Sequence, residues 1–175
     1  RNGAGAGNSS SIIIVGQEFS SPNYINYRGF LGFPTIPEMW AAVACTLYID
    51  GAVDNSATDF NLNIFGARAW KSVIGSDDFT HFDGYKSSGS YTGTVLNNTW
   101  NTASYSSGYN KLVFNAAGRD SLMAAVGDTL WIALLSSRDV AATQPSGLEL
   151  VAFSTVSDGP SVEPYLSITY SAMNV

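Results

Sequence analysis

Residues 59–65 read Asp-Phe-Asn-Leu-Asn-Ile-Phe, and this stretch decides the fold class. Its apolar residues alternate strictly with two amides, Asn61 and Asn63. A period of two residues places successive side chains on opposite faces of a strand. The stretch therefore predicts a half-buried antiparallel strand whose outward face carries amides instead of charges. The apolar side chains predicted to face inward are Phe60, Leu62 and Ile64.

Strand patterns recur along the chain on both sides of this stretch. The most apolar are 12–15, a β-branched run that predicts a strand buried on both faces or covered by a partner, and 41–50. Further strands are predicted over 27–33, 90–96, 111–114, 129–135, 148–154 and 165–170. The pattern of 115–126 predicts one short helix near 116–126 that ends at Gly127. Eight or nine strands with one helix indicate an all-β, antiparallel, jelly-roll-like β-sandwich.

The composition agrees with an all-β protein and argues against several other classes. Of the 175 residues only 13% are charged, whereas 23 are Ser, 13 Asn, 12 Thr and 17 Gly. With 4 Glu and 3 Lys, the i, i+4 charge pairs that support exposed helices are almost absent. A net charge of −6 without a basic cluster argues against nucleic acid as a partner. No apolar run approaches the roughly 20 residues of a membrane-spanning helix, so we expect no membrane insertion.

The two ends of the chain differ from the rest. Residues 1–9 are rich in Gly and Ala and predict a flexible arm or linker, 10–171 predict a single β-sandwich domain, and 172–175 predict a tail. Because the chain begins with Arg1 and carries no signal-like segment, we expect a processed protein or a fragment of a longer chain. The single cysteine, Cys45, lies in an apolar strand and is expected to be a small buried hydrophobe.

Seven segments share an order and spacing that extend from about Ser10 to Ser171. They are 28–33, 36–37, 44–49, 109–118, 136–140, 145–149 and 163–170. In this order they resemble DNRLRE-type modules, which are similar to carbohydrate-binding modules and occur in secreted bacterial proteins and bacteriophage structural proteins. The resemblance implies a jelly-roll β-sandwich. Two positions depart from the family pattern, Glu163 in place of Asp and Pro34 in place of Asp, so a metal role of those carboxylates does not carry over.

Residues suited to catalysis are few. His81 is the only histidine, and it lies among Asp77, Asp78 and Asp83. One histidine supplies too few ligands for a typical zinc site, and no G-x-S-x-G turn accompanies it. Carboxylates suit calcium better, so the three aspartates are candidate calcium ligands, with turn capping as the alternative interpretation. We predict no other cofactor and a protein that is not an enzyme.

Five aromatic residues in loops or polar surroundings are candidate ligand-binding residues. They are Trp70, Tyr85, Tyr91, Trp100 and Tyr105, with Tyr109 nearby in the sequence. One interpretation is a stacking platform for sugar rings or an interface with another protein. The other is structural packing beneath the long irregular segment 68–90.

Two function hypotheses follow. The first is a structural or adhesive surface protein, such as a bacteriophage capsid-decoration or appendage subunit, in which the strand Ile12, Ile13, Ile14 and Val15 pairs with a neighbouring subunit. Its expected partners are further copies of itself or other virion or surface proteins, and its expected location is extracellular or on a virion. The second is a carbohydrate-binding module of a secreted bacterial protein, with glycans as ligands of the loop aromatics. An enzyme would need, for example, a cleft with two carboxylates about 5–9 Å apart.

Overall fold

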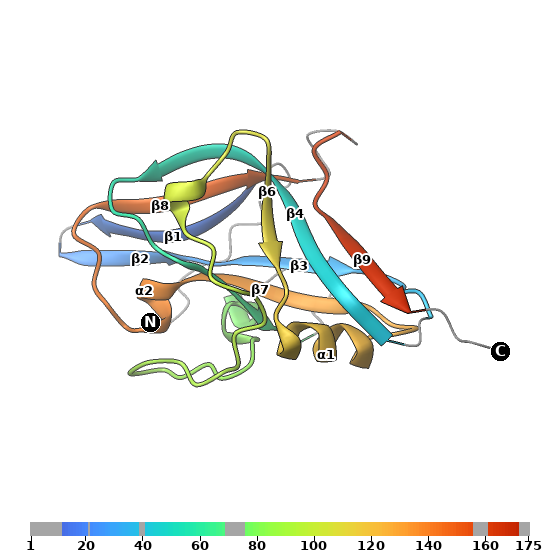
Figure 1. Cartoon of the computed structure of the whole chain (residues 1–175). Coiled ribbons are helices and arrows are strands. Elements are labelled where there is room, and N and C mark those ends of the chain that lie inside the picture. Colours follow the sequence, from blue (N-terminus) through green and yellow to red (C-terminus); the bar gives the residue numbers. More distant parts are fainter. Residues whose placement is uncertain (1–11, 21, 39–40, 69–75, 156–160, 172–175) are drawn as a thin grey trace.

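The computed structural model describes residues 12–20, 22–38, 41–68, 76–155 and 161–171 (Figure 1). The strands within these residues are β1 (Ile12–Ser20), β2 (Asn23–Tyr27), β3 (Gly29–Phe33), β4 (Ala41–Ser56), β5 (Leu62–Gly66), β6 (Tyr109–Val113), β7 (Leu130–Ser136), β8 (Leu148–Ser154) and β9 (Tyr165–Ser171). The helices are α1 (Ala116–Ala124), α2 (Ser137–Val140) and the 3-10 turns η1 (Ser76–Thr80) and η2 (Thr102–Ser104). None of the described helices is long and apolar enough to span a bilayer.

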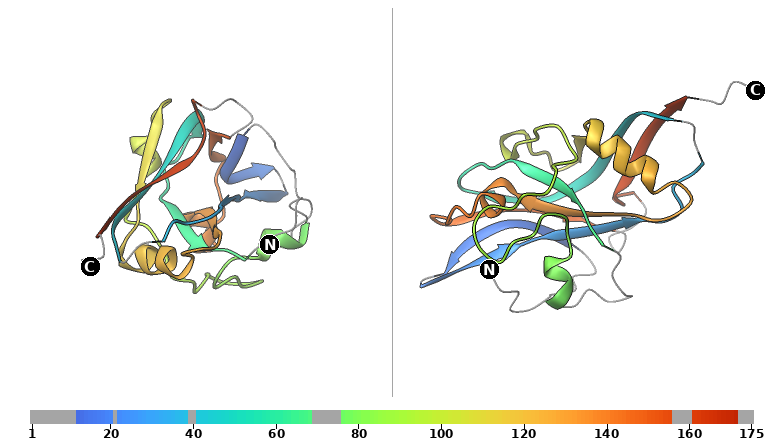
Figure 2. Two further views of the ribbon diagram at one scale, coloured as in Figure 1. Left: turned by 90° about the vertical axis from the view of Figure 1, so that its right-hand side faces the viewer. Right: turned by 90° about the horizontal axis from the view of Figure 1, so that it is seen from below.

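The strands form two antiparallel sheets. The larger sheet has the order β2-β1-β8-β4-β6, with β9 also paired to β4, and the smaller has the order β3-β7-β5. From β3 to β8, consecutive strands alternate between the two sheets, an arrangement that suits a jelly roll. Seen end-on, the strands wrap around one interior, with α1 beside it (Figure 2). The predicted antiparallel β-sandwich with one short helix near 116–126 is confirmed.

β4 organises the larger sheet because it is long enough for three partners. Residues 41–48 pair with β9 and residues 51–56 with β8, while residues 46–50 pair with β6. Since residues 46–48 pair with both β6 and β9, these two strands lie on opposite edges of β4. β8 and β9 follow one another along the other edge, and β9 lies at the margin of the sheet (Figure 1). The strand extends past its predicted end at Asp50 to Ser56.

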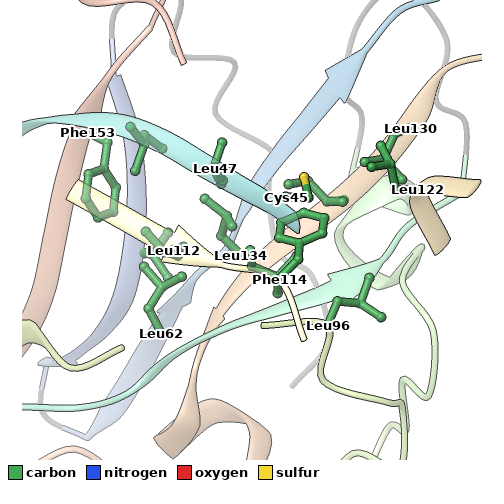
Figure 3. Packing of buried hydrophobic residues seen from close by; sticks show 14 of the residues in the cluster. Cys45, Leu47, Leu62, Leu96, Leu112, Phe114, Leu122, Leu130, Leu134 and Phe153 are labelled. Atoms are coloured by element: carbon green, nitrogen blue, oxygen red, sulfur yellow. The ribbon is translucent and has the colours of Figure 1, made fainter. Parts of the chain in front are cut away.

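The main core lies between the two sheets and follows from strand alternation. Phe60, Leu62 and Ile64 are buried, as the alternating stretch predicts. Figure 3 shows side chains of both sheets meeting here, and Leu122 joins them from α1. Asn61 and Asn63 are half-buried instead of fully outward, and the Oδ1 of Asn61 accepts a hydrogen bond from Asn101 Nδ2 at 2.8 Å. The central buried residues include Cys45, Leu47, Leu112, Phe114, Leu134 and Phe153.

A side-chain cap starts α1. The Asn115 side chain accepts a hydrogen bond from Gly118 N at 3.0 Å, which satisfies one of the free N–H groups at the start of the helix. The helix ends at Ala124, slightly before the predicted end at Gly127. Gly127 adopts φ +78°, a backbone conformation that glycine reaches without steric cost, and turns the chain towards β7.

The strand predicted over 90–96 is wrong. Within this segment Tyr91 N bonds to Val140 O and Leu96 N bonds to Ile64 O, so its backbone groups have partners in different elements. A strand requires one neighbour along its length, and this segment changes neighbours within six residues.

The strand predicted over 27–33 is interrupted at Arg28. Residues 23–27 form β2 of the larger sheet and residues 29–33 form β3 of the smaller sheet. The chain therefore crosses from one layer of the sandwich to the other at a buried arginine.

Candidate ligand-binding face

Tyrosines gather on the outer face of the larger sheet, where β6, β4 and β9 run side by side. Leu47 and Ile49 of β4 are fully buried, so Tyr48 between them points away from the core. The register pairs Tyr48 with Tyr165 of β9 and with Lys111 of β6. One row of outward side chains therefore crosses three neighbouring strands.

The three tyrosines of this region, Tyr48, Tyr109 and Tyr165, are here called the tyrosine face. The rings of Tyr48 and Tyr165 stack, with 4.8 Å between centroids and 3° between planes. Tyr109 of β6 meets Tyr165 edge-on at 5.2 Å and Tyr48 at 6.3 Å. Each such aromatic contact contributes about 0.5–1.5 kcal/mol beyond area burial. The rings are therefore held in place, while Tyr165 keeps 43% of its surface exposed.

The hydroxyl of Tyr109 fixes the segment that leads into β9. It donates towards the carbonyl oxygens of Ser161 and Glu163, at 3.0 and 3.1 Å. Desolvation raises the pKa of Tyr109, and the neighbouring Tyr165, Asp50 and Glu163 raise the pKa further. The hydroxyl therefore stays protonated, and can donate these bonds, well into the alkaline range.

Polar groups surround the tyrosine face. The Nζ of Lys111 lies 5.6 Å from the centre of the Tyr48 ring, within the range of a cation–π contact. Asp50 pairs in register with Tyr109, and Thr46 pairs with Ser167 in the next outward row. Apolar ring faces with hydroxyl, ammonium and carboxylate groups beside them match a ligand that has both C–H faces and hydroxyls.

The predicted loop aromatics do not form one platform. Tyr91 is buried and Tyr85 is half-buried, and both pack on Phe82 in a second apolar cluster, with ring centroids 5.1 and 5.6 Å away. This arrangement corresponds to the structural-packing interpretation. Trp70 lies outside the described residues.

Trp100 and Tyr105 lie in another region and pack against the main core. Their rings approach Phe153 with centroids 6.3 and 6.0 Å away, and the Tyr105 hydroxyl donates to Ala152 O at 3.2 Å. Burial, with the charges of Asp54 and Asp50, raises the pKa of Tyr105 to about 12. Trp100 and Tyr105 therefore serve packing in this structure and belong to a different cluster from Tyr85 and Tyr91.

A buried arginine joins the second cluster to the sandwich. Arg28 donates from Nε to Asp139 Oδ2 at 2.7 Å, and neither side chain is exposed. Its guanidinium also bonds to the Tyr91 hydroxyl and to Phe79 O, and its Cζ lies 3.8 Å from the centre of the Phe79 ring. These contacts connect the turn between β2 and β3 with η1 and α2. They fasten the irregular segment to the core.

Of the calcium candidates, the described Asp78 and Asp83 do not belong to a metal-binding cluster of described side chains. In the described part of the chain no group of three or more His, Cys, Asp or Glu side chains is close enough to hold a metal ion. Asp78 Oδ1 lies 3.1 Å from His81 Nδ1, and Asp83 N bonds to Gly66 O. The side chain of Asp77 lies outside the description.

The predicted assembly strand is incorporated into the larger sheet. Ile12, Ile13, Ile14 and Val15 pair with residues 154–151 of β8, and from Gly16 onwards β1 also pairs with β2. Val15 is buried and the three isoleucines are half-buried. A neighbouring subunit would therefore have to use the edge opposite β8, and this pairing stays a prediction.

Comparison with known proteins gives no relative. No family model matches the chain, and neither the curated proteins nor the solved structures contain a significant match. The resemblance to DNRLRE-type modules therefore stays a prediction, and the functional argument rests on the chain's own geometry.

The tyrosine face contains residues that the sequence reasoning did not select. Tyr48 and Tyr165 lie in predicted strands, next to Leu47 and Leu166, so alternation alone predicts that they point outward. The missing information was which strands are neighbours. Tyr165 follows Tyr48 by more than a hundred residues, and only the pairing of β9 with β4 brings the two rings together.

Proposed function

We propose that this protein is a non-enzymatic adhesive module that binds glycans through its tyrosine face. The observation that supports the proposal is the stack of the half-buried Tyr48 on the exposed Tyr165, which Tyr109 braces edge-on. The C–H face of a pyranose ring packs on an aromatic ring, and neighbouring polar groups bind its hydroxyls. Such contact needs neither a catalytic residue nor a metal.

The charges near the face favour neutral glycans. Lys111 is one cation beside Tyr48, whereas Asp50 and Glu163 are two anions near Tyr109. The whole chain carries a formal charge of −6. An acidic sugar would therefore be repelled on approach, while a neutral sugar would not.

A glycan array with neutral and acidic oligosaccharides tests this proposal, followed by calorimetry on the best neutral binder. We expect binding to neutral glycans, and a loss of about tenfold in affinity for Tyr165→Ala, because one stacking contact is removed. Tyr165→Phe keeps the ring and should retain most of the affinity.

Tyr24→Ala is the matched control, because Tyr24 is an exposed tyrosine on β2, away from the tyrosine face. Its affinity should equal that of the unmodified protein. No binding to any glycan, or equal losses in Tyr24→Ala and Tyr165→Ala, would reject the proposed function.

A second candidate function is that of a structural subunit, and a separate surface favours it. On the outer face of β2, β1 and β8, the exposed side chains of Ile25 and Leu148 flank Glu18 in one row. Apolar side chains in such positions suit contact with another protein. Under both candidates we propose an extracellular or virion-surface location. The double variant I25D/L148D should abolish assembly into larger particles under electron microscopy while leaving glycan binding intact.

A further inference from the structure

β9 is an open edge of the larger sheet. Within the described residues, its backbone pairs with β4 and with no other strand. An edge strand presents a row of N–H and C=O groups that a further strand can bond. β9 is seven residues long, enough for a stable row of such bonds.

Other edges of the sandwich carry features that hinder pairing, and β9 lacks them. β6 carries Lys111, and Asn98 N bonds to Val113 O beside it. The edge of β5 is occupied by the segment around Leu96, whose N–H donates to Ile64 O. β2 and β3 have only five residues each. β9 contains no charged residue and no proline. Lysine, proline and short length are the usual means of protecting an edge.

The sequence of β9 is complementary to itself when reversed about Ile168. In an antiparallel pair centred there, Ile168 faces its own copy, Ser167 faces Thr169, and Leu166 faces Tyr170. Apolar residues thus meet apolar residues and hydroxyls meet hydroxyls. Tyr170 is 55% exposed in the single chain, and the pairing gives it an apolar neighbour.

We propose that two copies of this chain dimerise by antiparallel pairing of their β9 strands, with the two-fold axis at Ile168. The larger sheets of the two copies then form one continuous sheet. Pairing of seven residues buries less area than a standard stable interface, so we expect a dissociation constant on the order of micromolar. The two Tyr165 side chains lie on the same side, about 20 Å apart along the strands. If the face binds glycans, the dimer is bivalent, but the pairing itself does not depend on that function.

Sedimentation velocity of the full chain over a range of concentrations tests the proposal through charge substitutions. Ser167 and Thr169 are exposed, so lysines there leave the core intact. In the variant S167K/T169K each lysine faces a lysine across the axis, and in S167E/T169E each glutamate faces a glutamate. We expect the unmodified chain to dimerise, each variant to be a monomer, and the two variants mixed in equal amounts to form a heterodimer.

N23K/Y24K is the matched control, because it places two lysines at exposed positions of β2, the edge strand at the far side of the same sheet. It should dimerise like the unmodified chain, and circular dichroism should show all variants folded. The proposal is overturned if the unmodified chain is a monomer up to about 1 mM. It is equally overturned if S167K/T169K still dimerises, or if the two charged variants do not pair with each other.

Discussion

At the scale of single residues, the Arg28–Asp139 pair shows how a charged residue is tolerated inside a weakly charged protein. Asp139 accepts bonds from Arg28 Nε at 2.7 Å and Nη2 at 3.2 Å, and from the Tyr91 hydroxyl at 3.1 Å. Desolvation of the two charges is costly, and the mutual attraction and these bonds offset it. The pair joins distant parts of the chain, so its main effect is to fix the irregular segment against the sandwich.

Replacing Asp139 by Asn should destabilise the protein by about 3–5 kcal/mol, because Arg28 remains charged and buried without its counter-charge. Urea unfolding measures the change. The double variant R28M/D139L removes both charges and should lose less stability than Asp139→Asn. If the free energy of unfolding of Asp139→Asn lay within about 0.5 kcal/mol of that of the unmodified protein, the role given to the pair would be contradicted.

Cys45 gives a pH-dependent prediction. Burial raises the pKa of its thiol from 9.0 to about 12. The thiol should therefore not react with a disulfide reagent at pH 8 in the folded protein, and should react once urea unfolds the chain. Above pH 9 the unfolded chain releases this proton while the folded chain retains it, so the free energy of unfolding falls as pH rises towards 12. In Cys45→Ala the free energy of unfolding should fall less over the same pH range. Rapid reaction of the Cys45 thiol with the reagent in the folded protein would contradict its burial.

At the scale of elements, the side chain of Asn97 provides hydrogen bonds to the backbone at the edge of β5. Beside β5, an edge strand of the three-stranded sheet, residues 94–97 lie without regular strand pairing. Asn97 Oδ1 accepts from Ile64 N at 2.7 Å, and its Nδ2 donates to Leu62 O at 3.0 Å. The amide thus satisfies backbone groups of β5 that a neighbouring strand would otherwise satisfy.

Asn97→Ala should cost about 2–4 kcal/mol, because two buried backbone groups of β5 lose their partners. Chemical denaturation measures the loss. Asn98→Ala changes an exposed neighbour and should stay within about 0.5 kcal/mol of the unmodified protein. Equal effects of the two substitutions would show that Asn97 does not support the edge of β5.

Elements were predictable where a local pattern determined them. The alternation around Leu62 and the pattern of 115–126 predicted a strand and a helix that the structure contains. The segment 90–96 has suitable strand residues but forms no strand, because its partners are fixed by contacts distant in sequence, such as Tyr91 N with Val140 O. Residues with high strand propensity are those that pack well on a sheet beside neighbouring strands. Propensity therefore mispredicts a segment that has no neighbouring strand along its length.

At the scale of the whole molecule, the jelly-roll-like architecture was predictable from composition and strand count, and the candidate site was not. Loop aromatics were the natural expectation, but Tyr91 is buried beside Phe82, and the half-buried Trp100 packs on Phe153 of the core. The rings of the tyrosine face belong instead to strands, and the meeting of Tyr48 with Tyr165 depends on β9 lying beside β4. Which strands are neighbours depends on the topology of the whole sheet, and local sequence patterns do not predict it.

The most direct test of the glycan-binding claim is an NMR titration of protein with carbon-13-labelled tyrosine rings. The probes are neutral glucose tetrasaccharides, one α-linked and one β-linked, and the neutral oligosaccharide that binds best in the array. We predict that the ring signals of Tyr48, Tyr109 and Tyr165 shift together, while those of Tyr85 and Tyr91 stay unchanged. Ring signals that remain still with every saccharide, or shifts confined to Tyr85 and Tyr91, would contradict the account.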